Sequence, residues 1–276
     1  MATTKISIII PCYNMGNFLL EAIESVEKVY DPAIHEVIIV DDGSNESLTL
    51  KIIAGIKKHR VITQKNGGLA NARNTGISNS KGKYLLFLDA DNLLTNGYLS
   101  VGAEILDQNE KVDIVYGESE MFGDTTGFLP TRPFNLQTLM SYNYIDACCL
   151  IRKTLLEELG GFDEKMPVQG LEDWELWLRA SFKGKQFYYL NGTIVQKYRV
   201  RGRSMIGIVG KKKRDSVYDY LEKKYPKHLS FTNLSDFYYK KFEAQTLGWT
   251  AKLFIKKYFP SFYEKLVVNG KFSRYL

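Results

Sequence analysis

From Lys5 to about Gly117, short runs of aliphatic and β-branched residues alternate with longer segments in which apolar positions recur at helical spacing. Short apolar runs are typical of buried strands, whereas a spacing near 3.6 residues is typical of amphipathic helices. The predicted strands are residues 6–10, 37–40, 61–64, 84–88 and 113–116, and the predicted helices are 18–28, 48–58, 68–78 and 97–109. This alternation indicates βαβ units, and therefore an α/β fold with a Rossmann-like, mostly parallel central sheet flanked by helices.

The pattern changes after Gly117, where turn residues over 123–133 predict an extended loop or hairpin. Further on, the sequence predicts helices over 154–159 and 171–182, each followed by glycine, and two short strands over 187–190 and 194–198. We therefore expect residues 1–117 to form a nucleotide-binding half and 118–206 a second half of the same domain, followed by a helical basic C-terminal extension over 207–276.

Two acidic turns follow predicted strands: Asp41-Asp42 after residues 37–40, and Asp89-Ala90-Asp91 after 84–88. In an open parallel sheet the ligand crevice lies beyond the carboxyl ends of the strands, so these carboxylates are expected to face a ligand. Carboxylates clustered at one edge repel each other unless a cation neutralises them. A divalent cation with oxygen ligands, which commonly bridges phosphate oxygens, would do so.

The other strand exits carry groups that suit a nucleotide. Pro11 stiffens a turn that presents Tyr13, whose ring can stack on a base, although Tyr13 could equally cap the core. Asp42 can accept hydrogen bonds from an imide or hydroxyl, although Asp41 and Asp42 could simply cap the next helix. Arg73 lies one turn inside a helix that a glycine turn opens, which suits a diphosphate or the polar edge of a base. The glycine spacing matches neither a dinucleotide fingerprint nor an ATP phosphate loop.

Composition limits the remaining classes. With 45% hydrophobic and 25% charged residues, the 276-residue chain is typical of a globular protein. Its three cysteines lack zinc-site spacing, and no stretch predicts a signal peptide or membrane span, so we expect a cytoplasmic protein.

The net charge of +6 is concentrated toward the C-terminus, in residues 247–276, where lysines alternate with aromatic residues. We interpret this segment as a peripheral contact with anionic membrane, at the inner face of the cell membrane, and we expect no nucleic-acid partner. The alternative is a helix packed on the rest of the protein with a solvated basic face.

The motifs of residues 6–204 together resemble a family 2 glycosyltransferase of the GT-A fold. They are residues 7–14 (SIIIPCYN), 41–44 (DDGS), 66–76 (NGGLANARNTG), 89–91 (DAD) and 172–174 (EDW). The resemblance implies a nucleotide-diphosphate sugar donor, UDP-linked by expectation. It places Pro11, Tyr13 and Asp42 around the base and Arg73 near the base or diphosphate. It also places Asp89 at the donor and Asp91 beside Mg²⁺ or Mn²⁺.

The same resemblance makes residues 118–206 the acceptor-binding half of the catalytic domain. It makes Asp173 the base of an inverting transfer, with Glu172 and Trp174 bordering the acceptor or sugar site. Without it, Asp173 could be a helix-start acid that interacts with the helix dipole. One position departs from the family pattern: many relatives have a metal-binding histidine where this chain has Arg201. Arginine cannot bind a cation but can contact the diphosphate, which weakens the prediction of a metal.

We therefore expect an inverting glycosyltransferase that moves one sugar from a nucleotide donor to a glycan or lipid-linked acceptor. The main alternative is a catalytically inactive nucleotide-sugar-binding or scaffold protein of the same fold. A nucleotide-sugar pyrophosphorylase would need a glycine-rich basic loop after the first strand, which residues 11–14 do not provide. A processive synthase would need membrane spans and a Gln-x-x-Arg-Trp pattern, which the sequence lacks.

Overall fold

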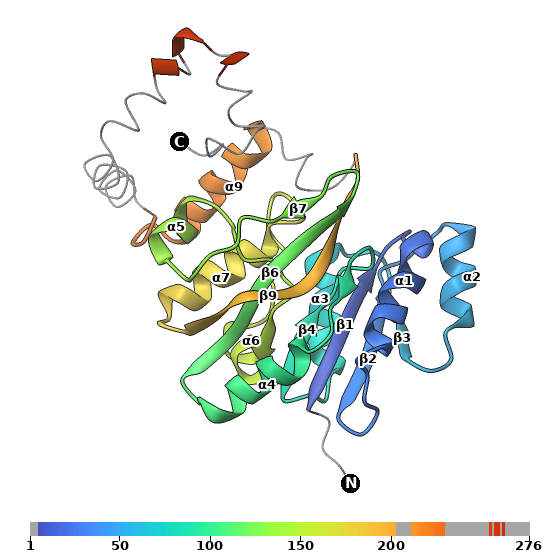
Figure 1. Ribbon diagram of the computed structural model, residues 1–276. Coiled ribbons are helices and arrows are strands. Elements are labelled where there is room, and N and C mark those ends of the chain that lie inside the picture. Colours follow the sequence, from blue (N-terminus) through green and yellow to red (C-terminus); the bar gives the residue numbers. More distant parts are fainter. Residues whose placement is uncertain (1–4, 203–210, 230–253, 256, 260, 263–276) are drawn as a thin grey trace. The chain divides into compact units, whose positions relative to one another are not determined.

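The computed structural model describes residues 5–202, 211–229, 254–255, 257–259 and 261–262 (Figure 1). The chain divides into two compact units, Met1–Lys224 and Tyr225–Leu276, and the central sheet and the predicted site residues belong to the first. Most of the basic aromatic segment over 247–276 lies outside the described residues. In the parts of the chain that are described, no helix has the length and apolar character needed to cross a membrane.

One mixed sheet forms the centre of the first unit, with the strand order β3-β2-β1-β4-β8-β6-β9-β5 and with β7 beside β6. The strands are β1 (Ile6–Cys12), β2 (His35–Asp41), β3 (Arg60–Thr63), β4 (Tyr84–Phe87), β5 (Leu93–Leu94), β6 (Val112–Gly123), β7 (Gly127–Phe128), β8 (Leu150–Arg152) and β9 (Gln186–Val200). Strands β1 to β4 are parallel to one another, whereas β8 is antiparallel to both β4 and β6. The predicted parallel βαβ half is therefore present, and antiparallel pairing joins it to the second half.

Helices surround this sheet (Figure 1). Those described are α1 (Gly16–Glu27), α2 (Ser47–Gly55), α3 (Leu69–Asn79), α4 (Tyr98–Gln108), α5 (Leu136–Ser141), α6 (Lys153–Leu159), α7 (Glu172–Phe182) and α9 (Lys211–Lys224). On one face, Ile6, Ile8 and Ile10 of β1 join a core cluster with apolar residues of α1 and α4. On the other, α3 packs on β1 and β2. Both faces of β1 are covered, which explains its continuous apolar run.

The close approach of α3 to β1 depends on Gly76. A Cβ atom at this position would lie 2.3 Å from Cγ2 of Ile9, so a larger residue would push the helix away. Since Arg73 lies one turn earlier on the same helix, this contact also fixes the backbone that carries Arg73.

The second half differs from the prediction in three places. The two strands expected over 187–190 and 194–198 form one strand, β9, because the Asn-Gly turn signal at 191–192 is absorbed as an irregularity opposite β6. The strand β8 and the helix α5 were not predicted, since each is too short to show a period. Of the two alternatives expected for residues 123–133, an extended loop or a hairpin, the structure has a hairpin, as β7 pairs antiparallel with the end of β6.

Candidate functional site

The carboxyl ends of β1, β2, β3 and β4 lie at one edge of the sheet, because these strands are parallel and in register. This edge therefore gathers the strand exits that the sequence marked. Pro11 is buried and lies within β1, opposite Val40, and not in the turn where it was expected. Tyr13 is exposed, and Asn14 adopts a left-handed backbone at φ 53°. The exposed ring of Tyr13 leaves the predicted stacking on a base sterically open.

Asp42 holds in place the turn between β3 and α3. Its Oδ1 accepts hydrogen bonds from the Gly67 N–H (2.9 Å) and from Nε2 of Gln64 (2.7 Å), and its Oδ2 accepts from the Gly68 N–H (2.8 Å). Gly68 has φ 88°, a conformation that favours glycine. Asp42 is buried, so its first role is to shape the turn that opens α3. A contact of Asp42 with the nucleotide base remains a prediction.

Arg73 links two of the acidic motifs. Its side chain is buried, and its Nη2 donates to Oδ1 of Asp89 at 2.8 Å while its Nη1 donates to Oε1 of Glu172. The guanidinium also lies over the ring of Phe162, 5.2 Å from its centroid. Burial lowers the pKa of Arg73, but the charges of Asp89 and Glu172 outweigh this and hold the pKa above its usual value. Arg73 is therefore a buried cation that joins α3, the DAD turn and the start of α7.

Asp173 lies beside this ion-pair cluster at the start of α7. It is buried, and its Oδ2 accepts a hydrogen bond from Nδ2 of Asn143 at 3.0 Å. Burial raises the pKa of Asp173 well above its usual range, and the charge of Glu172 raises it further, although Arg73 opposes both effects. A carboxylate with a raised pKa is a stronger base than an ordinary aspartate, which suits removal of a proton from a hydroxyl group. Its role as base remains a prediction.

Asp146, which was not expected at the site from the sequence, precedes β8 and faces the same cluster. Its Oδ1 accepts from the Cys148 N–H (2.8 Å) and from Nε2 of Gln196 (2.7 Å), and among the described residues its Oδ2 has no hydrogen-bond partner. Burial, followed by the charge of Asp89, raises the pKa of Asp146 to about 6. No motif or spacing marks this residue, because it reaches the site only through the antiparallel pairing of β8 with β4.

Substitution of Asp146 with asparagine is expected to stabilise the protein at alkaline pH. Because the folded-state pKa of about 6 exceeds the usual 3.8, ionisation of Asp146 lowers stability progressively between these pH values and fully above pH 6. Asparagine keeps the accepting oxygen without the charge. D146N should gain about 1–3 kcal/mol in the free energy of unfolding at pH 8. Urea denaturation at pH 8 and at pH 4 measures this; an equal gain at both pH values would contradict the electrostatic explanation.

The second aspartate of the DAD turn also has an arginine partner. Nη2 of Arg201, just after β9, lies 2.6 Å from Oδ2 of Asp91. Among the described residues, no group of three or more His, Cys, Asp or Glu side chains could hold a metal ion. With the Arg201 guanidinium against Asp91, these side chains do not fit a divalent cation. The expected Mg²⁺ or Mn²⁺ remains a prediction.

Trp174 is buried in the interior of the unit. Its indole N–H donates to the backbone oxygen of Leu139 in α5 at 2.6 Å, and its ring meets Tyr218 of α9 edge to face at 5.3 Å. These contacts anchor the start of α7, which carries Asp173. A direct contact of Trp174 with the sugar remains a prediction.

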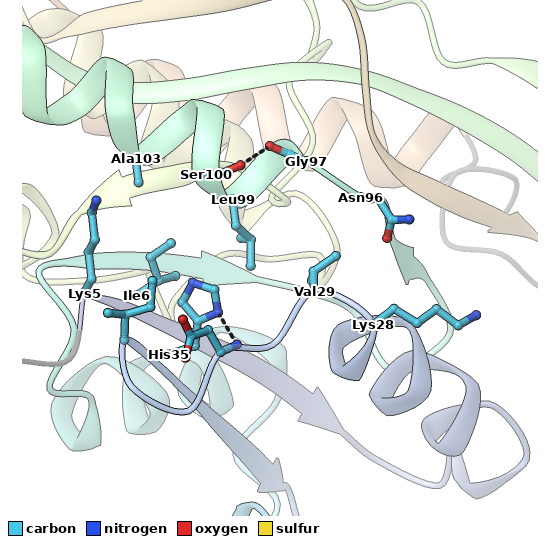
Figure 2. Close-up of a pocket in the computed structure, with 12 residues that line it drawn as sticks. Lys5, Ile6, Lys28, Val29, His35, Asn96, Gly97, Leu99, Ser100 and Ala103 are labelled. Carbon is cyan, nitrogen blue, oxygen red and sulfur yellow. Dashed lines mark hydrogen bonds between the residues drawn. The ribbon is translucent and has the colours of Figure 1, made fainter. Parts of the chain in front are cut away.

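A cavity of about 480 Å³ lies elsewhere on the unit, at the edge where β1 and β2 begin (Figure 2). Lys5, His35 and Leu99 are among the residues that line it, and none of the predicted site residues does. The cavity is therefore separate from the edge at which the acidic motifs meet.

The family model for glycosyl transferase family 2 matches residues 7–160, more than half of the chain. The chain therefore belongs to glycosyl transferase family 2. It is 32% identical over 186 residues to the Escherichia coli protein "UDP-Glc:alpha-D-GlcNAc-diphosphoundecaprenol beta-1,3-glucosyltransferase WfaP", a match that covers 65% of this chain and 71% of that protein. It is 40% identical over 108 residues to an uncharacterized glycosyltransferase of Rickettsia felis, with 38% of this chain and 18% of that protein covered. The chain thus spans less than a fifth of the length of this second relative.

Among solved structures, the chain is similar to Staphylococcus aureus TarS in complex with UDP-GlcNAc, with a TM-score of 0.61 and 19% sequence identity. The likeness covers 83% of this chain and 73% of that one. A likeness at this level of identity concerns the fold, and it confirms the GT-A fold expected from the sequence.

Proposed function

We propose that this protein is an inverting glycosyltransferase that uses Asp173 as its base. The observation that supports the proposal most is the meeting of Asp89, Glu172 and Asp173 around the buried Arg73 at the ligand edge of the sheet. Four ionisable groups in one largely buried cluster are costly to maintain unless the site uses them. Membership of glycosyl transferase family 2 supports sugar transfer as that use.

In the proposed reaction, the acceptor hydroxyl attacks the anomeric carbon while Asp173 takes its proton. A new bond forms between the anomeric carbon and the acceptor oxygen, and the bond to the diphosphate oxygen breaks with its electron pair leaving on the nucleoside diphosphate. The raised pKa of Asp173 favours its taking this proton. Asn143, which donates to Oδ2, orients the carboxylate.

We propose a UDP-sugar as donor and a lipid-linked glycan as acceptor. The printed name of the E. coli relative specifies a UDP-Glc donor and a diphosphoundecaprenol-linked acceptor, and the S. aureus structure contains UDP-GlcNAc. The basic aromatic composition of residues 247–276 supports a contact with anionic membrane at its cytoplasmic face, where such an acceptor would be presented.

One experiment tests the donor, the acceptor and the membrane contact together. The full chain is incubated with UDP-glucose or UDP-GlcNAc and with a polyprenyl-diphosphate-linked sugar in anionic or neutral vesicles, and both glycan product and vesicle flotation are measured. We expect transfer from one UDP-sugar and salt-sensitive flotation with anionic vesicles only. Binding of UDP without turnover on any acceptor would favour the alternative, an inactive nucleotide-sugar-binding protein. The observation that favours this alternative is that both aspartates of the DAD turn form ion pairs with arginines. Equal flotation with neutral vesicles would contradict the electrostatic membrane contact.

A further inference from the structure

Arg201 makes an unusual set of contacts at the ligand edge. Its Nη2 donates to Oδ2 of Asp91 at 2.6 Å, and its guanidinium lies 4.8 Å from the ring centroid of Phe18 in the first turn of α1. Nη2 also lies 3.6 Å from Sδ of Met15. The cation is therefore held between the exit of β1 and the exit of β4, where the predicted donor site lies.

A second arginine fixes this position. Nε of Arg199 donates to the backbone oxygen of Asp91 (2.9 Å), and the Arg199 N–H donates to Oδ1 of Asn92 (2.9 Å). The Arg199 guanidinium lies over both Phe18 and Phe122, 4.8 Å and 4.4 Å from their ring centroids. These two hydrogen bonds hold the end of β9 against Asp91 and Asn92. They leave Arg201 little freedom to move away from Asp91.

Arg201 retains unused donor capacity at this site. Its Nε is buried and has no hydrogen-bond partner among the described residues. A guanidinium carries five N–H donors in a planar fork that matches phosphate oxygens. The Arg201 side chain is 31% exposed, so the guanidinium can still donate to an anionic ligand beside Asp91.

The local charge balance favours a guanidinium over a metal ion here. Oδ2 of Asp91 already accepts a hydrogen bond from Nη2 of Arg201 at 2.6 Å. A divalent cation at Asp91 would have to displace Arg201 or approach it against charge repulsion.

We propose that Arg201 takes the place of the divalent cation: it binds the donor diphosphate and offsets the charge of the departing nucleoside diphosphate. This inference rests on the proposed function. When the bond from the anomeric carbon to the diphosphate oxygen breaks, the electron pair leaves with the diphosphate, and Arg201 stays protonated throughout. A fixed cation of this kind needs no reorganisation as the charge develops.

Binding of UDP, GDP and dTDP, measured by calorimetry in the presence of EDTA, tests the inference without requiring turnover. We expect one nucleoside diphosphate, UDP by our proposal, to bind wild-type protein equally well with EDTA or with Mn²⁺. R201A should weaken that binding about 10- to 100-fold in EDTA, the range for loss of a charged hydrogen bond to phosphate. K197A is the matched control, since Lys197 lies on β9, close before Arg201 in the sequence, and pairs with Glu120 on the surface.

A second variant should make UDP binding depend on Mn²⁺. R201H replaces the guanidinium with a metal ligand beside Asp91, so its UDP binding and transfer should be weak in EDTA and recover with Mn²⁺. Two results would overturn the role of Arg201 without touching the proposed function: UDP binding by the wild-type protein that requires Mn²⁺, or UDP binding by R201A as tight as that of the wild type in EDTA. Failure of every nucleoside diphosphate to bind would overturn the proposed function and this inference with it.

Discussion

D173N is expected to lose sugar transfer by about 10²- to 10⁴-fold, the contribution of a positioned general base. The asparagine side chain keeps nearly the same size but cannot take the proton from the acceptor hydroxyl. Donor binding should change little, because the contacts of Asp173 are with Asn143 and the Trp174 N–H rather than with the strand exits predicted to hold the nucleotide. Transfer rates and UDP affinity, measured on the same preparation, separate the two effects.

The pH profile offers an independent readout for Asp173. Since burial and Glu172 raise its pKa, the carboxylate stays protonated at pH values where an ordinary aspartate is ionised. The rate should therefore fall as pH is lowered, with an acid limb above the usual aspartate range. The remaining activity of D173N should lack that limb.

The matched control for this experiment is D113N. Oδ2 of Asp113 accepts a hydrogen bond from the Gln186 N–H at 2.9 Å, outside the acidic cluster, and asparagine can keep an accepting oxygen there. D113N should transfer sugar at the wild-type rate. If D173N formed product as fast as D113N, Asp173 would not be the base.

The largest loss of stability is expected for R73M. Methionine has a comparable length but no charge, so it leaves the buried carboxylate of Glu172 and the partly exposed one of Asp89 without their cation. Removal of one partner from a buried ion pair costs about 3–5 kcal/mol. Urea denaturation at neutral pH measures this loss.

A double substitution separates lost pairing from lost packing. R73M/E172Q removes both charges of the pair, so it should recover part of the stability that R73M loses, as expected for two groups that interact directly. R60M is the surface control: Arg60 is exposed and donates to the backbone oxygen of Asn79, and its loss should cost less than about 1 kcal/mol. No recovery in the double variant would mean that Arg73 stabilises the fold through its contact with Phe162 rather than through charge.

Much of the first half was predictable from local pattern. The apolar runs determined β1 to β4, and the helical periods between them determined that these strands run parallel, since a crossover helix returns the chain to the same edge. Once the strands are parallel, the residues that follow them share one edge. Asp42 and the DAD turn could therefore be assigned to the site before any contact was known.

The tertiary structure alone decided which of these groups pair. Arg73 meets Glu172 across 99 positions of sequence, and Arg201 meets Asp91 across 110. Asp146 is brought to the site by β8, a short antiparallel strand that shows no periodicity in the sequence. Local sequence sets the element and the point at which it ends, because those depend on neighbouring residues. The charge balance at the site depends on strand order in the sheet, which is fixed only when the whole core packs.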